Sequence, residues 1–184
     1  LFQQKEFFEH DAPKGVKLPL LLTIIYSVVA ALSVIPALGP ALAMVPEGLH
    51  GIGIGTSVIG TIVTIIISWL FVALIFFAFV KIVGYATCSY KEVLSVTGYV
   101  SVLLIICSIL TFLVSMIGSA NSIALLLLNG AFLLWSIPVW YFGLASVCGD
   151  IPKKKLVISI VIPVLIMVIV SVVSTMMAVS QGMM

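Results

Sequence analysis

Five long stretches of this chain contain only uncharged residues, and each is long enough to cross a lipid bilayer as a helix. They are residues 18–38, 56–80, 93–117, 123–147 and 156–178, and none contains Asp, Glu, Lys, Arg or His. A helix needs about 20 apolar residues to span the hydrocarbon core. Their apolar residues are continuous rather than alternating, which disfavours a membrane β-barrel. The sequence therefore predicts an all-α integral membrane protein, a five-helix bundle forming one domain over residues 1–184.

Composition excludes the other common classes of protein. Apolar residues make up 63% of the chain and charged residues 8%, whereas a soluble domain carries about a quarter charged residues. So few polar groups cannot cover the surface of a soluble fold. Disorder is excluded as well, because it requires low hydrophobicity and high charge.

The lysines predict the orientation of the bundle. They fall into three groups beside the predicted spans: Lys5, Lys14 and Lys17; Lys81 and Lys91; and Lys153, Lys154 and Lys155. These groups alternate along the chain and therefore share one side of the membrane, which the positive-inside rule identifies as cytoplasmic. We expect the N-terminus inside and the C-terminus outside, in the cell membrane, or in the endoplasmic reticulum or Golgi membrane of a eukaryotic source. The mixed, acidic N-terminal stretch is unlike a secretory signal peptide.

Two segments outside the spans have open interpretations. In residues 1–17, Phe7 and Phe8 stand among charged residues, which is typical of an interfacial amphipathic helix on the cytoplasmic leaflet; a frayed tail is the alternative. The outer connection, residues 39–55, is rich in Gly and Pro, which break helices. It is either a loop packed on the outer helix ends or a re-entrant segment lining a polar path.

The chain shows no pattern typical of a catalytic, cofactor or metal site. Glu47 and His50 lie on the opposite predicted side of the membrane from Glu9, His10 and Asp11. A closed metal site needs three or four ligands, and the two groups cannot combine to form one. Gly51 to Gly55 lacks the Lys-Ser/Thr ending of a phosphate loop. We therefore expect no enzyme, cofactor, metal or nucleic-acid partner.

Cys88, Cys107 and Cys148 are interpreted as small buried thiols, because a disulfide is not expected in a reducing cytoplasm.

Small and polar residues inside the spans favour helix packing. Small residues recur four apart, which lets helices approach closely within the bundle or across a dimer seam: Ser27 and Ala31, Ser171 and Thr175, and Ser174 and Ala178. Asn129 can hydrogen-bond to a neighbouring helix, and Pro138 is expected to kink the fourth span. A weakly selective pore built on Asn129 and Pro138 is the alternative.

The cluster Lys153, Lys154 and Lys155 is the strongest electrostatic feature. It either anchors the topology or binds lipid headgroups or an acidic partner, and the two roles are compatible.

The order of several short motifs resembles the Yip-one domain family of Ypt/Rab-interacting proteins. These motifs are Phe7-Phe8, Gly84, Tyr90-Lys91-Glu92-Val93-Leu94, Gly98-Tyr99, Trp135, Gly143-Leu144 and Lys154-Lys155. The resemblance implies a five-helix bundle with a cytoplasmic N-terminus, self-association and no catalytic activity. Eukaryotic members are linked to Rab-type GTPases and vesicle traffic. Their Asp-Leu-Tyr-Gly-Pro stretch and the proline that often follows the tyrosine of the third span are absent here. These differences favour a short prokaryotic branch, with an archaeal source as one option.

Two functional hypotheses follow from the sequence. The first is a self-associating membrane scaffold or adaptor that contacts membrane lipids or a partner protein through a cytoplasmic surface made by Phe7, Phe8, Tyr90, Lys91 and Lys153 to Lys155. The second is a small channel or carrier that uses residues 39–55 and the fourth span at Pro138.

Overall fold

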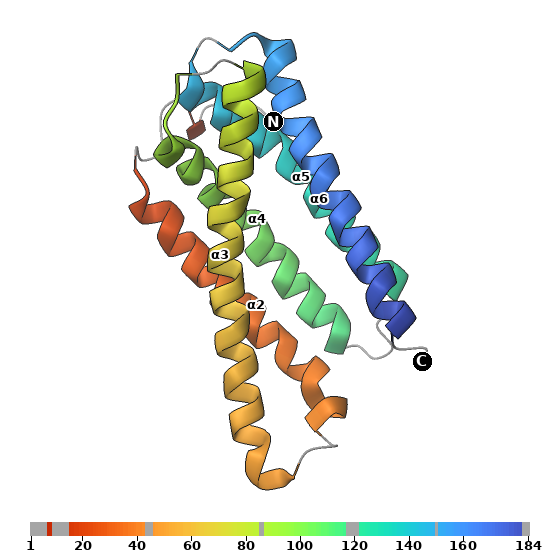
Figure 1. The fold of residues 1–184 in the computed structure, drawn as a ribbon. Helices are drawn as coiled ribbons and strands as arrows, with labels where there is room; N and C mark the ends of the chain where they lie inside the picture. Colours follow the sequence, from red (N-terminus) through yellow and green to blue (C-terminus); the bar gives the residue numbers. More distant parts are fainter. Residues whose placement is uncertain are drawn as a thin grey trace.

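The structure is a computed structural model that describes residues 7–8, 15–42, 46–84, 87–116, 122–149 and 151–181. This part of the chain consists mainly of helices (Figure 1). Its helices are α2 (Lys17–Leu42), α3 (His50–Gly84), α4 (Tyr90–Met116), α5 (Ser122–Cys148) and α6 (Lys153–Gln181), with a short 3-10 helix, η2 (Glu47–Leu49), before α3. The prediction of an all-α protein is confirmed.

Within the described residues, three helices are long and apolar enough to cross a membrane. They are His50–Val83, Tyr90–Val114 and Leu127–Cys148, and Lys17–Ser33 is a shorter apolar helix. The length and the apolar composition of these helices are those of a membrane protein. The five-span count and the orientation stay predictions.

The connection between α2 and α3 is shorter than the sequence predicted. Helix α2 continues to Leu42 rather than residue 38, and α3 begins at His50 rather than residue 56. The prediction of an irregular segment is therefore wrong for residues 39–42 and 50–55. Glycine costs only about 1 kcal/mol in a helix relative to alanine. Breaking the helix in an apolar environment would leave backbone groups without hydrogen bonds, and the free-energy cost of each such group is several times larger. The helix therefore continues through its glycines.

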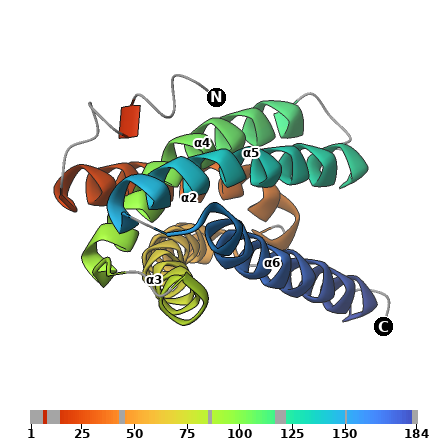
Figure 2. The ribbon, with the colours of Figure 1, turned by 90° about the horizontal axis from the view of Figure 1, so that it is seen from above.

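Helices α3 and α4 form the centre of the bundle. Helix α3 packs against α2, α4 and α6, while α4 packs against α2, α3 and α5. Successive helices run in opposite directions, so that the α3–α4 and α5–α6 connections lie at the same end (Figure 1). Seen along the bundle, α6 lies beside α3 near that end and diverges from it toward the C-terminus (Figure 2).

The main buried cluster lies at that same end. Phe76 of α3 stacks on Trp140 of α5, with ring centroids 3.7 Å apart and the ring planes inclined by 2°. Val93 of α4, Leu144 of α5 and Ile160 of α6 pack around them and are fully or almost fully buried. Four helices are thus joined near the α3–α4 and α5–α6 connections by apolar contact.

Buried hydroxyl groups join helices that are distant in sequence. The Oγ atoms of Thr23 in α2 and Ser101 in α4 lie 3.1 Å apart in a hydrogen bond. The Ser95 hydroxyl donates to the carbonyl of Gly15 at 2.9 Å, and the Ser159 hydroxyl donates to the carbonyl of Phe79 at 3.4 Å. These bonds hold α2 on α4 and α6 on α3 without placing a charge in the interior.

Gly98 marks the closest approach of α2 to α4. A Cβ atom at this position would lie 2.8 Å from the Cα and 2.9 Å from the carbonyl carbon of Pro19. Neither backbone atom can move aside without shifting α2. By contrast, Gly60 on α3 is exposed and has nothing within 4 Å of the same hypothetical Cβ.

We expect Gly98→Ala to destabilise the bundle by about 1–3 kcal/mol, which is the usual cost of overpacking. The matched variant Gly60→Ala should be neutral or stabilising by up to about 1 kcal/mol, since alanine is the better helix former. Thermal unfolding of both variants in the same detergent, followed by circular dichroism, tests this. Equal melting temperatures for the two variants would contradict the proposed contact.

Candidate functional site: the lysine face

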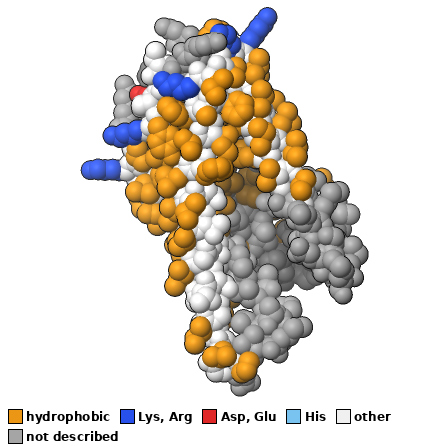
Figure 3. All heavy atoms as spheres, in the orientation of Figure 1, with side chains coloured by type: hydrophobic (Ala, Val, Ile, Leu, Met, Phe, Trp, Pro, Cys, Tyr) orange, Lys and Arg blue, Asp and Glu red, His pale blue; other side chains and the backbone are white. Residues whose placement is uncertain are grey.

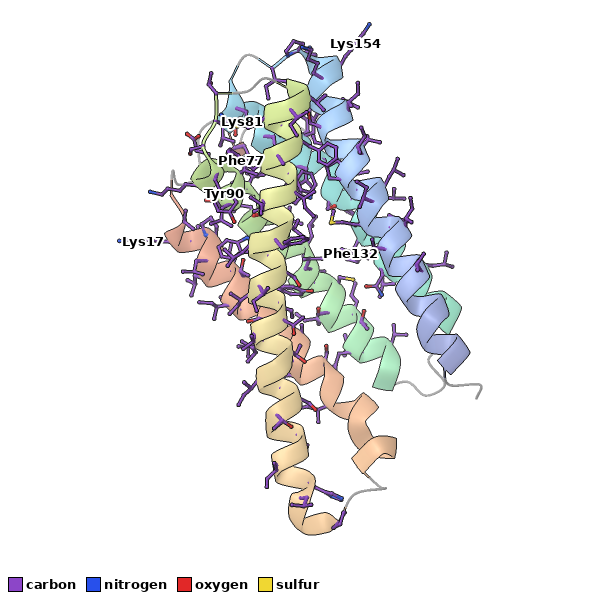
Figure 4. The ribbon with its side chains drawn as sticks, viewed as in Figure 1. Lys17, Phe77, Lys81, Tyr90, Phe132 and Lys154 are labelled. Carbon is purple, nitrogen blue, oxygen red and sulfur yellow. A yellow bond between two sulfur atoms is a disulfide. The ribbon has the colours of Figure 1, made fainter. Side chains whose placement is uncertain are left out.

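Every lysine that the structure describes lies in the upper half of the molecule, from Lys154 at the top to Lys17 lower down on one side (Figures 3 and 4). Together they define the lysine face: Lys17, Lys81, Lys91, Lys153, Lys154 and Lys155. They come from the start of α2, the last turn of α3, the start of α4 and the start of α6. Lys155 is half-buried and the others are exposed. Figure 3 shows blue side chains in the upper half of the molecule, with orange apolar surface around and below them.

Tyr90 fixes the start of α4 on α3. Its hydroxyl donates a hydrogen bond to the carbonyl of Leu70 at 2.9 Å. Its ring meets the ring of Phe77 edge to face at a centroid distance of 5.8 Å. The Lys81 ammonium lies 5.6 Å from the same Phe77 ring centroid, within the range of a cation–π contact. Figure 4 shows Phe77, Lys81 and Tyr90 close together, so Tyr90 positions the lysine face while remaining half-buried.

A capping box sets the first turn of α4. The Ser89 backbone N–H donates to the Glu92 carboxylate at 2.7 Å, and the Ser89 hydroxyl donates to the same oxygen at 2.9 Å. Such a pair satisfies amide groups that a helix start leaves without partners. Lys91, between the two residues, remains exposed. The Ser-x-x-Glu spacing was visible in the sequence but was not used to locate this helix start.

The rings of Phe7 and Phe8 pack on the protein itself. Both meet the ring of Tyr99 edge to face, at centroid distances of 5.4 and 5.6 Å. Phe8 also lies against Gly143, where an added Cβ would be 3.3 Å from its Cε1 atom. Both rings are half-buried against α4 and α5, so part of each ring faces the protein. An interfacial position of this segment stays a prediction. The rest of residues 1–14 lies outside the described part of the chain.

The cysteine prediction needs a correction too. Cys88 and Cys148 form a disulfide, with Cα atoms 4.6 Å apart, a normal spacing for such a bond. The interpretation of both residues as free thiols is wrong. They are 60 residues apart in sequence, and only the antiparallel packing of α4 on α5 brings them together. Cys107 is a free, buried cysteine, as predicted.

The remaining predicted residues lie within helices. Ser27 and Ala31 are buried inside the chain, which fits helix packing. The Cys107 thiol lies 3.5 Å from the side-chain oxygen of Asn129, which links α5 to α4. Helix α5 continues through Pro138 to Cys148. The other small residues belong to α6, but their side chains lie outside the described part: Ser171, Ser174, Thr175 and Ala178.

Two further features bear on ligand binding. An apolar groove between α2 and α4 has a volume of about 250 Å³ and is lined by Val29, Leu32, Ser33, Ser108, Ile109 and Phe112. It involves neither residues 39–55 nor Pro138. Among the residues that the structure describes, no group of three or more His, Cys, Asp and Glu side chains is placed to hold a metal ion.

The comparisons with known proteins give one match. A family model described as the Yip1 domain matches residues 1–175, a range that contains the whole lysine face and the contacts of Gly98, Tyr99 and Gly143. No curated protein and no solved structure matches the chain significantly.

Proposed function

Because this chain belongs to the Yip1 domain family, we propose that it is a non-enzymatic, multi-pass scaffold or adaptor of a prokaryotic cell membrane. The resemblance carried by motifs such as Gly98-Tyr99 and Gly143-Leu144 is thereby confirmed at the level of the family. In the proposed role, the lysine face binds anionic lipid headgroups or an acidic partner protein. The observation that carries the proposal is the position of all six described lysines in one half of the bundle, where helix ends come together.

The physical basis of the proposed binding is electrostatic. Each Lys or Arg close to an anionic membrane surface contributes about 1 kcal/mol, and the contribution decays within a Debye length. Five of the six described lysines are exposed, and the packed core beneath them limits the loss of side-chain and backbone freedom on binding. The contacts of Tyr90 and Phe8 support this face from within.

We expect replacement of Lys153, Lys154 and Lys155 by Gln to weaken binding to an anionic surface on the order of a hundredfold. The protein, held in phosphatidylcholine nanodiscs, is titrated with vesicles of phosphatidylcholine with or without phosphatidylglycerol. The matched control replaces the same lysines with Arg, which keeps the charge. Binding that survives the Gln replacements, or that does not need phosphatidylglycerol, would exclude the lipid-headgroup role of these lysines.

The proposed topology has five spans with the lysine face in the cytoplasm. Helices α2, α4 and α6 begin at the lysine face and α3 and α5 end there, which agrees with alternating crossings. The chain would then enter from the cytoplasm and finish outside.

A pair of reporter fusions tests this topology. We expect a fluorescent protein fused to the N-terminus to fluoresce, because it folds in the cytoplasm, and alkaline phosphatase fused to the C-terminus to be active, because it needs the exterior. Exchanging the two reporters is the control and should silence both. Activity of the same reporter at both ends would mean an even number of crossings.

Self-association is the third element of the proposal. In α6 the buried positions Ser159 and Pro163 are four apart, and the same spacing continued along the helix leads to Ser171 and Thr175. Here α6 diverges from α3 (Figures 1 and 2). Small residues on such a face allow a second helix to approach closely, so a second copy of the chain is the proposed partner.

We expect Thr175→Leu to shift the protein from dimer to monomer, since the longer side chain would separate the two α6 helices. Val173→Leu is the matched control, because Val173 is exposed and lies on the opposite side of α6. Mass photometry of both variants in nanodiscs or mild detergent measures the oligomeric state. A Thr175→Leu protein that remains dimeric would place the contact elsewhere.

The channel hypothesis lacks a specific observation in its favour. Residues 50–55 are the first turns of α3, and the oxygen of Asn129 accepts a hydrogen bond from Cys107.

A further inference from the structure

The Cys88–Cys148 disulfide lies beside the helix ends that carry most of the lysine face. Cys88, in the α3–α4 connection, stands three residues before Lys91 of α4, and Cys148, the last residue of α5, stands five residues before Lys153 of α6. We propose that this pair is a reversible redox switch that fixes the lysine face when oxidised and releases it when reduced. The inference rests on the proposed function for the cytoplasmic location of the pair and for its effect on binding.

The cellular compartment argues for a reversible bond. The positive-inside rule assigns the lysine face to the cytoplasm, where thiols are kept reduced and disulfides are usually transient, catalytic or redox-sensing. A bond formed at that end of the bundle is therefore exposed to the cell's thiol pool. A cysteine pair with this placement senses the redox state of the compartment.

The position of the pair at helix joints lets it open without unfolding a helix. Cys88 lies in the non-helical segment 87–89, and Cys148 is the last residue of α5, followed by Gly149 with a φ of 64°. Both cysteines are at most 3% exposed. Exchange with dissolved thiols therefore takes place when a connection opens locally, while the α-helical hydrogen bonds remain intact.

Reduction changes the order of the lysine face rather than the fold. The stack of Phe76 on Trp140 and the burial of Leu144 hold α3 and α5 together without the disulfide. The covalent tie between the segment before Lys91 and the segment before Lys153 is lost. The start of α4, with Lys91, and the start of α6, with Lys153 to Lys155, are then less tightly fixed to each other, and ordering their lysines together on a surface costs more conformational entropy.

The chemistry balances with a low-molecular-weight disulfide as the oxidant. The Cys88 thiolate attacks one sulfur of this disulfide and releases the first small thiol. The Cys148 thiolate then attacks the Cys88 sulfur of the mixed disulfide and releases the second. In total, two protein thiols lose two electrons and two protons, and one small disulfide becomes two small thiols. The reverse exchange reduces the protein.

The redox state of the pair is measured in intact cells that produce the protein. Cells are quenched in acid, free thiols are blocked with N-ethylmaleimide, and disulfide thiols are then reduced and labelled with a maleimide-polyethylene glycol. We expect the pair to be largely reduced in growing cells, oxidised after treatment with diamide, and reduced again after diamide is removed. Cys88→Ser and Cys148→Ser should each abolish the shift, whereas Cys107→Ser should preserve it.

Two outcomes of this experiment would overturn the switch. A bond that stays oxidised throughout is a permanent structural link. A pair that remains two thiols after diamide treatment does not form the bond in the cell. Both results are obtained on the unmodified chain, so they do not depend on whether a variant folds.

The effect on binding is measured separately with purified protein. Oxidised and reduced forms in phosphatidylcholine nanodiscs are titrated with vesicles containing phosphatidylglycerol, and the Cys88→Ser, Cys148→Ser double variant serves as a permanently reduced reference. We expect the oxidised form to bind at least about fivefold more tightly, the lower end of typical coupling between sites. If the oxidised and reduced forms bind the vesicles equally tightly, the disulfide does not control binding by the lysine face. Absence of vesicle binding by either form instead counts against the proposed lipid-binding function.

Discussion

The hydrocarbon layer offers no hydrogen-bond partner to a backbone amide or carbonyl, and the architecture of this chain follows from that constraint. Helices continue through residues that end helices in water: α3 begins with a glycine-rich turn and α5 passes through Pro138. Side-chain hydroxyls obey the same constraint. Thr23 and Ser101 satisfy each other across α2 and α4, so polar groups serve as links between helices.

Among the described residues, the buried contacts concentrate in one part of the bundle. Apolar contacts, the ring stack of Phe76 on Trp140 and the disulfide all gather near the α3–α4 and α5–α6 connections. Toward the other end, α6 leaves α3 and large apolar side chains such as Ile52 and Ile59 are exposed. The lysines lie in the same half of the molecule as this cluster. The charged side chains therefore extend from helices whose ends are joined by buried apolar contacts.

The sequence predicted what depends on local composition. Uninterrupted apolar runs identified the helices. The alternation of lysine groups predicted that they share one side of the membrane, which stays a prediction, and Figure 3 shows the described lysines in one half of the molecule. The prediction for the start of α3 is wrong because it uses the helix-breaking tendency that glycine has in water. In water, the backbone groups released by breaking a helix form hydrogen bonds to solvent. The Ser89–Glu92 capping box had a recognisable spacing that was overlooked.

Features that depend on the packing of distant segments were beyond local reasoning. Nothing in the spacing of Cys88 and Cys148 indicates that α4 and α5 bring them together. Gly98 and Gly143 stood out only through the family resemblance, and their physical role is clear once Pro19 and Val96 are seen against them. The contact of the Phe7 and Phe8 rings with Tyr99 likewise joins segments that are distant in sequence.

The length of α3 sets a hydrophobic mismatch with the bilayer. Its apolar stretch, His50–Val83, has 34 residues, which at 1.5 Å per residue is about 50 Å, against a hydrocarbon thickness of about 30 Å. Even a tilt of about 40°, the upper end of the usual range, leaves about 40 Å along the membrane normal. Part of α3 therefore extends beyond the hydrocarbon core of a bilayer of that thickness. A membrane with a thicker hydrocarbon core accommodates this helix with less exposure of its isoleucines, so bilayer thickness itself favours some membranes over others for this protein.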